Sequence, residues 1–334
     1  MRTVAILILT VLLSCACKNE GEPLQPRSSS RPYEVLAVDD RDSIIYKVLD
    51  KDVEGLPQSE PSFDITATTE SRMDNTARLA RAIVKLTVDE RQFTTTRIRY
   101  ERNVYARPQI IVYITTPSVP ELKKAMEKDA PKLRNLLTSF EIAAESTALT
   151  KRNNPKAQEK IRRMFGVDML IPSDMQSEKV GKDFIWLSDN AKSGMKSICV
   201  YSSSSADAIR VRDSVMRRNI PGERDGMYMK TSEGSVTFQQ IAERYRKQGK
   251  TVIARGLWEM ENDAMGGPFV LHVTRQGNRY IYTEGFVYAP ETTKRNRIRQ
   301  TEAVLYTMKK NKGNLNIKHN GEQKNTRSHY ARRH

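Results

Sequence analysis

The chain has 334 residues, of which 29% are charged, and its formal net charge is +16. This length is enough for one large domain or for two smaller ones. Three cysteines are too few for a disulfide framework, and no apolar run after residue 14 is as long as a membrane-spanning helix.

The first residues have the pattern of a secretory signal peptide. Arg2 is basic, and residues 4–13 are almost wholly apolar but much shorter than the ~20 residues of a spanning helix. Leu12-Leu13-Ser14-Cys15 resembles the bacterial lipobox, in which the signal is cut before a cysteine that carries lipid. We therefore predict a signal peptide over residues 1–14 and lipidation of Cys15, palmitate included, which would anchor the protein to a membrane. The alternatives are an ordinary cleaved signal or a buried N-terminal strand, and Cys17 is a weaker candidate for the lipidated cysteine.

Both ends of the mature chain are polar and lack apolar periodicity. Residues 15–31 contain Gly21, Pro23 and Pro26, which is typical of a flexible tether with a mean span of ~20 Å. Residues 310–334 are rich in lysine and arginine, and Glu322 is their one acid. We expect a disordered basic tail there, and we favour a solubilising extension over a specific binding arm.

The first predicted α+β subdomain covers residues 32–150. Pro120 begins a long helix whose apolar face continues to Phe140, and Pro131 is expected to break or kink it. Apolar spacing also predicts a helix over residues 71–86. Residues 44–49 fit either a short strand or a helical turn. Strands are expected over residues 33–38, 63–68, 94–100 and 109–115.

The second predicted α+β subdomain covers residues 151–309. In the helix expected at 205–218, Ile209 and Val215 should face inward, and Arg210, Arg212, Arg217 and Arg218 outward. The other helices are expected over residues 155–165, 238–249 and 293–308. Strands are expected over residues 167–171, 184–187, 197–201, 226–230, 251–260, 269–275 and 279–288. Tight turns such as Gly277-Asn278 predict antiparallel sheets with helices on one face, which is an α+β fold.

Residues suited to catalysis or metal binding are sparse. His272 lies alone in a strand, and Cys199 lies in an apolar run where it should be a buried small hydrophobe. We find no metal-ligand spacing and no phosphate-binding loop, so no metal site, cofactor or catalytic residue is predicted. Glu259, Glu261 and Asp263 form a carboxylate cluster that would suit a glycosidase-like acid and base, or calcium. Solvated carboxylates beside a hairpin are the favoured interpretation.

Aromatic residues gather on the three strands between residues 251 and 288. Trp258, Tyr280 and Tyr282 are the candidates for an exposed recognition surface, together with the carboxylates Glu259, Glu261 and Asp263. Alternation places Tyr280 and Tyr282 on the same face as Phe286 and Tyr288. Packing of these rings in the core is the favoured interpretation.

Six short motifs indicate a family. They are RGLW at 255–258, MGGPFV at 265–270, EGFVYAP at 284–290, KRN at 294–296, YARPQ at 105–109 and FIWL at 184–187. They resemble an uncharacterised lipoprotein family of the Bacteroidota, the domain of unknown function 4837, over roughly residues 31–309. The resemblance implies a lipoprotein of the Gram-negative cell envelope, on the outer membrane, with its periplasmic or surface face left open. It supplies no known activity, so no catalytic residue is carried over.

Two functional hypotheses follow. The favoured one is a non-enzymatic binding or assembly component, tethered to the envelope and basic enough to bind an envelope protein or an anionic polymer. Nucleic acid is an improbable partner for an exported protein. The alternative is an envelope hydrolase of unfamiliar type that uses carboxylates near residues 259–267.

Overall fold

A computed structural model describes residues 25–240 and 251–311. The predicted signal peptide, Cys15, most of the tether and nearly all of the basic tail lie outside this part of the chain. Among the described residues, no helix combines the length and the apolar character that a membrane crossing requires.

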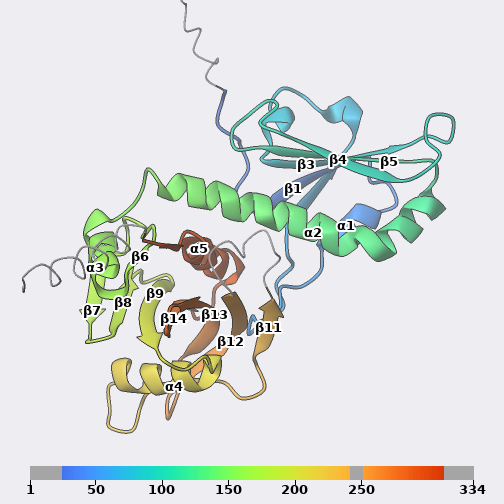
Figure 1. The fold of residues 1–334 in the computed structure, drawn as a ribbon. Helices are drawn as coiled ribbons and strands as arrows, with labels where there is room; N and C mark the ends of the chain where they lie inside the picture. The colour runs from blue at the N-terminus through green and yellow to red at the C-terminus, as the bar shows by residue number, and fades with distance from the viewer. Residues whose placement is uncertain (1–24, 241–250, 312–334) are drawn as a thin grey trace, which may run out of the picture.

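The first half builds a five-stranded sheet in the order β2-β1-β3-β5-β4 (Figure 1). Strand β1 pairs in parallel with β2 and β3, and β3 pairs in parallel with β5, whereas β4 is antiparallel to β5. The tight-turn reasoning did not predict these parallel pairs. Parallel neighbours need longer crossovers than a hairpin supplies. The strands are β1 (Glu34–Val38), β2 (Asp64–Thr68), β3 (Ala82–Val88), β4 (Arg97–Arg102) and β5 (Ile110–Thr116).

Helices α1 (Ile44–Leu49) and α2 (Val119–Leu149) cover one face of this sheet. Ser118 caps α2 by accepting a hydrogen bond from the backbone N–H of Glu121. The predicted apolar face is confirmed, since residues from Leu122 to Phe140 pack against the buried side chains of β1, β3 and β5. Pro131 lies within α2 without ending it, and its ring is exposed.

The second half builds an antiparallel sheet of eight strands in the order β10-β12-β13-β14-β9-β8-β7, with β11 paired to β12. Gly277 has a φ of +62°, which suits the tight turn between β13 and β14. The strands are β7 (Ser177–Val180), β8 (Phe184–Ser188), β9 (Met195–Ser203), β10 (Met229–Thr231), β11 (Thr237–Gln240), β12 (Thr251–Met260), β13 (Gly266–Gln276) and β14 (Arg279–Tyr288).

Helices cover both faces of the eight-stranded sheet. Helices α3 (Pro155–Phe165) and α5 (Arg295–Leu305) pack on one face, and α4 (Ala208–Asn219) packs on the other. The predicted α+β class is confirmed. The prediction that helices cover only one face of a sheet is correct for the five-stranded sheet and wrong for the eight-stranded one. Strand β6 (Val167–Asp168) pairs with β15 (Lys309–Lys310) beside this unit.

Helix α2 connects the two sheets. Its first turns pack on the five-stranded sheet, whereas Leu149 near its end belongs to the core that α3 and α5 share. Ser146 donates a hydrogen bond to the carbonyl of Ala303 in α5 at 3.2 Å. Figure 1 shows this helix running between the two units. Elements from both halves of the chain therefore meet around the last turns of α2.

One expected helix is absent from the place where it was predicted, and only the first three residues of a second lie among the described residues. Residues 71–86 form two short 3₁₀ turns, Glu70–Arg72 and Ala77–Leu79, and then strand β3. The β-branched pair Ile83 and Val84 is buried on both faces of the sheet, and such double burial imitates helical spacing. Phe238 lies in β11 rather than in a helix, and the rest of that expected helix lies outside the described residues.

Candidate functional site

The aromatic candidates are mostly core residues. Trp258 is 2% exposed and Tyr282 is fully buried, so neither belongs to a recognition surface. The indole of Trp258 donates a hydrogen bond to the carbonyl of Val287 at 3.2 Å, and Tyr282 stacks on Tyr201 with ring centroids 5.0 Å apart. Tyr280 is half-buried against the same cluster. These rings therefore pack in or against the core, which was the favoured interpretation.

The carboxylate candidates line a shallow cavity of about 700 Å³ beside Gly266 and Gly267. Lys230 forms ion pairs with both Glu259 and Glu261, and Ser232 donates a hydrogen bond to Glu259 at 2.8 Å. These contacts, with that of Ser232 the strongest, hold the pKa of Glu259 below its usual range. A glycosidase acid needs a raised pKa. Asp263 is exposed and accepts a hydrogen bond from the next backbone amide.

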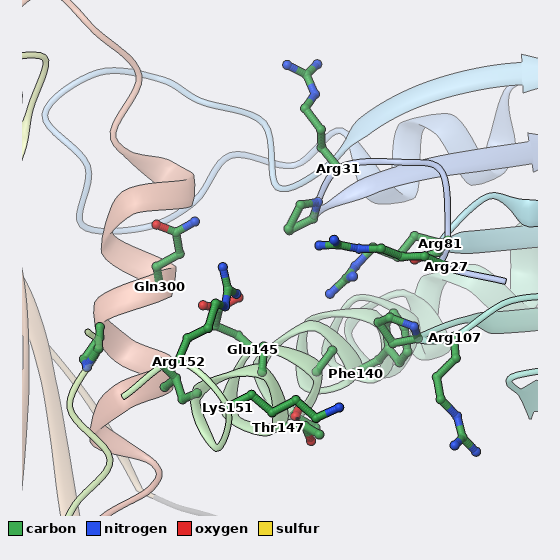
Figure 2. A pocket seen from close by; sticks show the side chains of 18 of the residues that line it. Arg27, Arg31, Arg81, Arg107, Phe140, Glu145, Thr147, Lys151, Arg152 and Gln300 are labelled. Atoms are coloured by element: carbon green, nitrogen blue, oxygen red, sulfur yellow. Dashed lines mark hydrogen bonds between the residues drawn. The ribbon is translucent and has the colours of Figure 1, made fainter. Parts of the chain in front are cut away.

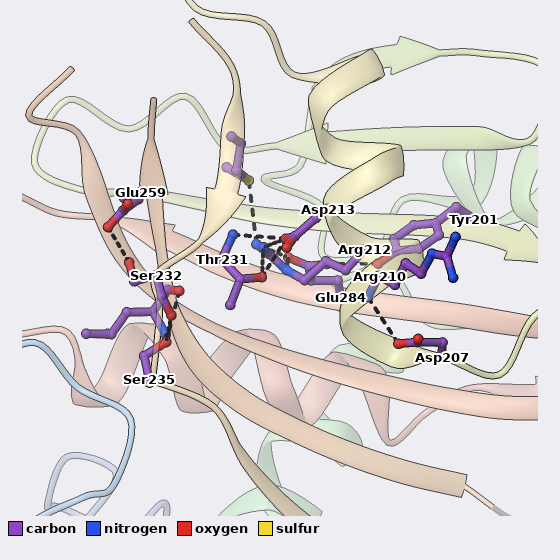
Figure 3. A network of polar contacts seen from close by, with 12 residues as sticks. Tyr201, Asp207, Arg210, Arg212, Asp213, Thr231, Ser232, Ser235, Glu259 and Glu284 are labelled. Carbon is purple, nitrogen blue, oxygen red and sulfur yellow. Dashed lines mark hydrogen bonds and ion pairs between the residues drawn. The ribbon is translucent and has the colours of Figure 1, made fainter. Parts of the chain in front are cut away.

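A second polar cluster, which was not predicted, has a fully buried ion pair at its centre (Figure 3). Arg212 of α4 and Glu284 of β14 have no exposed side-chain surface and form an ion pair at 2.9 Å. Tyr201 donates a hydrogen bond to Glu284 at 3.0 Å, and Arg212 donates one to Thr231 at 2.9 Å. Burial raises the pKa of Glu284, against the lowering effect of Arg212. The prediction that Arg212 faces outward is therefore wrong.

Two other isolated residues are also buried. Cys199 is buried, as predicted, and burial raises the pKa of its thiol far above the usual value. Burial lowers the pKa of His272 to about 3, and its ring lies edge-on to Tyr306 at 4.8 Å. Within the described part of the chain, no group of three or more histidine, cysteine or acidic residues is placed to hold a metal ion.

A much larger cavity, of about 1110 Å³, lies where the chain enters the fold (Figure 2). Its wall is made by residues 27–32, by the last turns of α2, by residues 172–175 and by one face of α5. Typical small-molecule pockets measure ~300–1,000 Å³, so this cavity can take a ligand of at least drug size.

The cavity is strongly basic. Eight arginine or lysine side chains line it, against only two acids, Glu145 and Asp174. Three of the eight are neutralised by ion pairs, namely Arg31 with Glu34, Arg81 with Glu141, and Lys196 with Asp174 and Asp189. In the described residues, no ion pair neutralises the other five, which are Arg27, Arg102, Arg107, Lys151 and Arg152.

The cationic side chains around the cavity differ in direction. In Figure 2, Arg27 and Arg152 reach into the space between residues 27–32 and α2 from opposite sides, whereas Arg31 and Arg107 point away from it. Arg102 lies over the ring of Tyr100 at 5.7 Å. Arg27 and Arg152 are therefore the best-placed pair for an anion inside the cavity.

Backbone hydrogen bonds hold the wall formed by the incoming chain. Arg107 donates its N–H to the carbonyl of Pro26 at 2.9 Å, and Ser29 donates its N–H to that of Leu79 at 3.0 Å. The last residues of the predicted tether are thus bound to the fold, beside the five-stranded sheet. The run of three serines at 28–30 and the prolines and arginines beside it gave no signal for this attachment in the sequence.

Ionic contacts hold the α5 wall against the first unit. Glu60 accepts hydrogen bonds from the backbone N–H groups of Lys294 and Arg295 at the start of α5, at 2.7 and 2.9 Å. Arg295 also forms an ion pair with Asp64 of β2 at 2.6 Å. These contacts fix the position of α5, whose Thr301 and Val304 line the cavity.

The two halves of the chain match two family models. Residues 154–307 match the domain of unknown function 4837 (DUF4837), which confirms the resemblance for the second half. Residues 28–150 match a different model, the domain of unknown function 8532 (DUF8532). A crystal structure from Bacteroides thetaiotaomicron VPI-5482 is similar at 17% identity with a TM-score of 0.27, over 45% of this chain and 46% of that chain. No curated protein matches the chain.

Proposed function

We propose that this chain, whose halves match domains of unknown function 8532 and 4837, is a membrane-anchored envelope lipoprotein that binds an anionic ligand in its basic cavity. The binding is non-enzymatic, and the ligand belongs to the envelope, on the outer membrane. The excess of positive charge in the cavity is the observation that carries the proposal.

The charge excess supports anion binding for a physical reason. Like charges repel, and five cations without an acidic partner around one cavity raise the free energy of the empty protein. Arginine also presents a planar set of donors that suits phosphate and carboxylate groups. An anionic ligand would relieve the repulsion and use these donors.

The sequence and the place of the cavity support the anchoring. The lipobox-like run ends at Cys15, and the first described residues, which follow ten positions later, already approach the cavity wall. Two or three acyl chains on Cys15 would hold the protein at a bilayer, since each buried CH₂ contributes ~0.8 kcal/mol. A cavity beside the tether would then face the envelope surface.

A hydrolase that uses Glu259 and Glu261 has no comparable support. Lys230 neutralises both carboxylates, and the pKa of Glu259 is shifted away from that of a general acid. We therefore keep the binding role as the proposal.

Anion binding is testable with inorganic polyphosphate as the probe. The full-length protein, purified from membranes in detergent, should bind it with an affinity that falls as salt rises. The double variant Arg27→Gln with Arg152→Gln should bind at least tenfold more weakly, because hydrogen bonds to charged groups contribute about 1.5–3 kcal/mol each.

The matched control is Arg163→Gln with Arg218→Gln. These two arginines are exposed on α3 and α4 and do not line the cavity. Their replacement removes the same total charge as the replacement of Arg27 and Arg152. The control should retain the affinity of the unmodified protein. Equal affinities in all three proteins would rule out the cavity as the binding site.

Anchoring is tested separately by metabolic labelling. Radiolabelled palmitate should appear on the protein, and Cys15→Ala should abolish the label and release the protein from sedimented membranes. A Cys15→Ala protein that sediments as firmly as before would contradict the lipid anchor.

A further inference from the structure

We infer that the anionic ligand is a membrane phospholipid, whose phosphate binds Arg27 and Arg152 and whose apolar part lies along the last turns of α2. This inference rests on the proposed function and names the ligand class of the same cavity.

The first argument is that the cavity wall has two chemically different parts. Cations reach in from the incoming chain and from the end of α2, as Figure 2 shows for Arg27 and Arg152. Between them the wall is made of small or apolar residues, of which Pro32, Ala143, Ala144 and Ala148 carry accessible surface, with Phe140 and Val304 nearly buried behind them. A free inorganic anion would use only the cations, whereas an amphiphile would also cover the apolar wall.

The second argument is reach. Eleven residues separate Cys15 from Arg27. A flexible chain of this length spans ~20 Å on average. If Cys15 is held in the bilayer, the cavity lies within reach of the headgroups, because residues 27–32 are themselves part of the cavity wall. A lipid is then the anionic ligand present at the highest local concentration.

The third argument concerns the acids of the cavity. Asp174 is paired with Lys196 at 3.2 Å, whereas Glu145 forms no ion pair in the described part of the chain. A carboxylate accepts hydrogen bonds and repels a second phosphate. A headgroup with one phosphate and the free hydroxyl groups of a glycerol would suit this arrangement. The phosphate would accept hydrogen bonds from the two arginines, and the hydroxyl groups would donate hydrogen bonds to Glu145.

The test uses the lipidated full-length protein in nanodiscs of phosphatidylcholine. The discs contain a small fraction of a photoactivatable phosphatidylglycerol, or of the matching phosphatidylcholine analogue, and mass spectrometry locates the crosslinks. We expect crosslinks to the last turns of α2 and to residues 27–32, at least tenfold more for phosphatidylglycerol. They should be lost in Arg27→Gln with Arg152→Gln and kept in Arg163→Gln with Arg218→Gln.

A second variant separates the lipid from a soluble anion. Ala144→Leu with Ala148→Leu fills the apolar wall and leaves every cation in place. It should reduce the phosphatidylglycerol crosslinks severalfold while polyphosphate binding and the unfolding midpoint stay unchanged.

The outcomes distinguish the two proposals. Polyphosphate binding that depends on Arg27 and Arg152, without enriched phosphatidylglycerol crosslinks in the cavity, would overturn the lipid inference and leave the anion-binding function standing. Crosslinks that survive loss of both arginines would also overturn the inference. Failure of both probes to depend on the two arginines would overturn both proposals.

Discussion

Replacing Arg212 by methionine should strongly destabilise the second half of the protein. Arg212 and Glu284 have no exposed side-chain surface, and the guanidinium makes two contacts of 2.9 Å with one carboxylate oxygen of Glu284. Methionine fills much of the volume but leaves Glu284 charged or forces it to take up a proton. Loss of one partner of a buried pair costs about 3–5 kcal/mol.

The double replacement tests the physical reason. Arg212→Met with Glu284→Leu removes both charges, and such apolar substitution of a buried pair is often neutral. It should recover most of the lost unfolding free energy, although Tyr201 then loses its acceptor at 3.0 Å. Arg212→Lys should lie between, because lysine keeps the charge and loses the planar donor set.

Urea unfolding, followed by tryptophan fluorescence, measures these differences without the screening that guanidinium salts cause. Trp186 and Trp258 both belong to the core that contains Arg212's neighbours on α4 and β14. An Arg212→Met protein within about 1 kcal/mol of the unmodified protein, or a double variant no more stable than the single one, would refute the reasoning.

Two further predictions concern the same sheet. His272 has a pKa of about 3 in the folded protein, so the unfolded chain takes up a proton near its usual pKa of ~6.5 and the folded protein does not. Stability is therefore lost as pH falls from ~6.5 towards 3, by about 2 kcal/mol at pH 5. The thermal midpoint of His272→Leu should fall less over this range, and parallel curves would contradict the prediction. Gly267→Ala would place a Cβ 2.0 Å from the carbonyl oxygen of Val287, and should destabilise by at least ~2 kcal/mol. Gly234→Ala meets no atom within 4 Å but has a φ of +70°, and should cost less. Equal unfolding free energies for the two glycine variants would show that the close approach of β13 and β14 is unimportant.

The second sheet was predictable because its signals are local. Long apolar and aromatic runs, bounded by Gly266-Gly267 and by the tight turn at Gly277, define β12 to β14 within one continuous stretch of sequence. The same rules failed over residues 71–86. Strand β3 lies between β1 and β5, both of its faces are buried, and its apolar residues therefore show no strict alternation.

The two polar sites were hidden for different reasons. Arg212 follows Arg210 on an amphipathic helix and is easily assigned to the solvent face, although a lone acid, Glu284, in an otherwise apolar strand was a usable signal for a buried partner. The basic cavity combines residues near positions 27, 81, 107, 152 and 174. Each is an ordinary surface charge in the sequence, and only the packing of α2 against both units brings them together.

The most direct measurement of the central claim is a crystal structure of the full-length chain grown with selenate, an oxyanion that anomalous scattering locates. The account predicts a selenate within hydrogen-bond distance of both Arg27 and Arg152, inside the cavity. Selenate bound at other surface arginines, with none in the cavity, would contradict it.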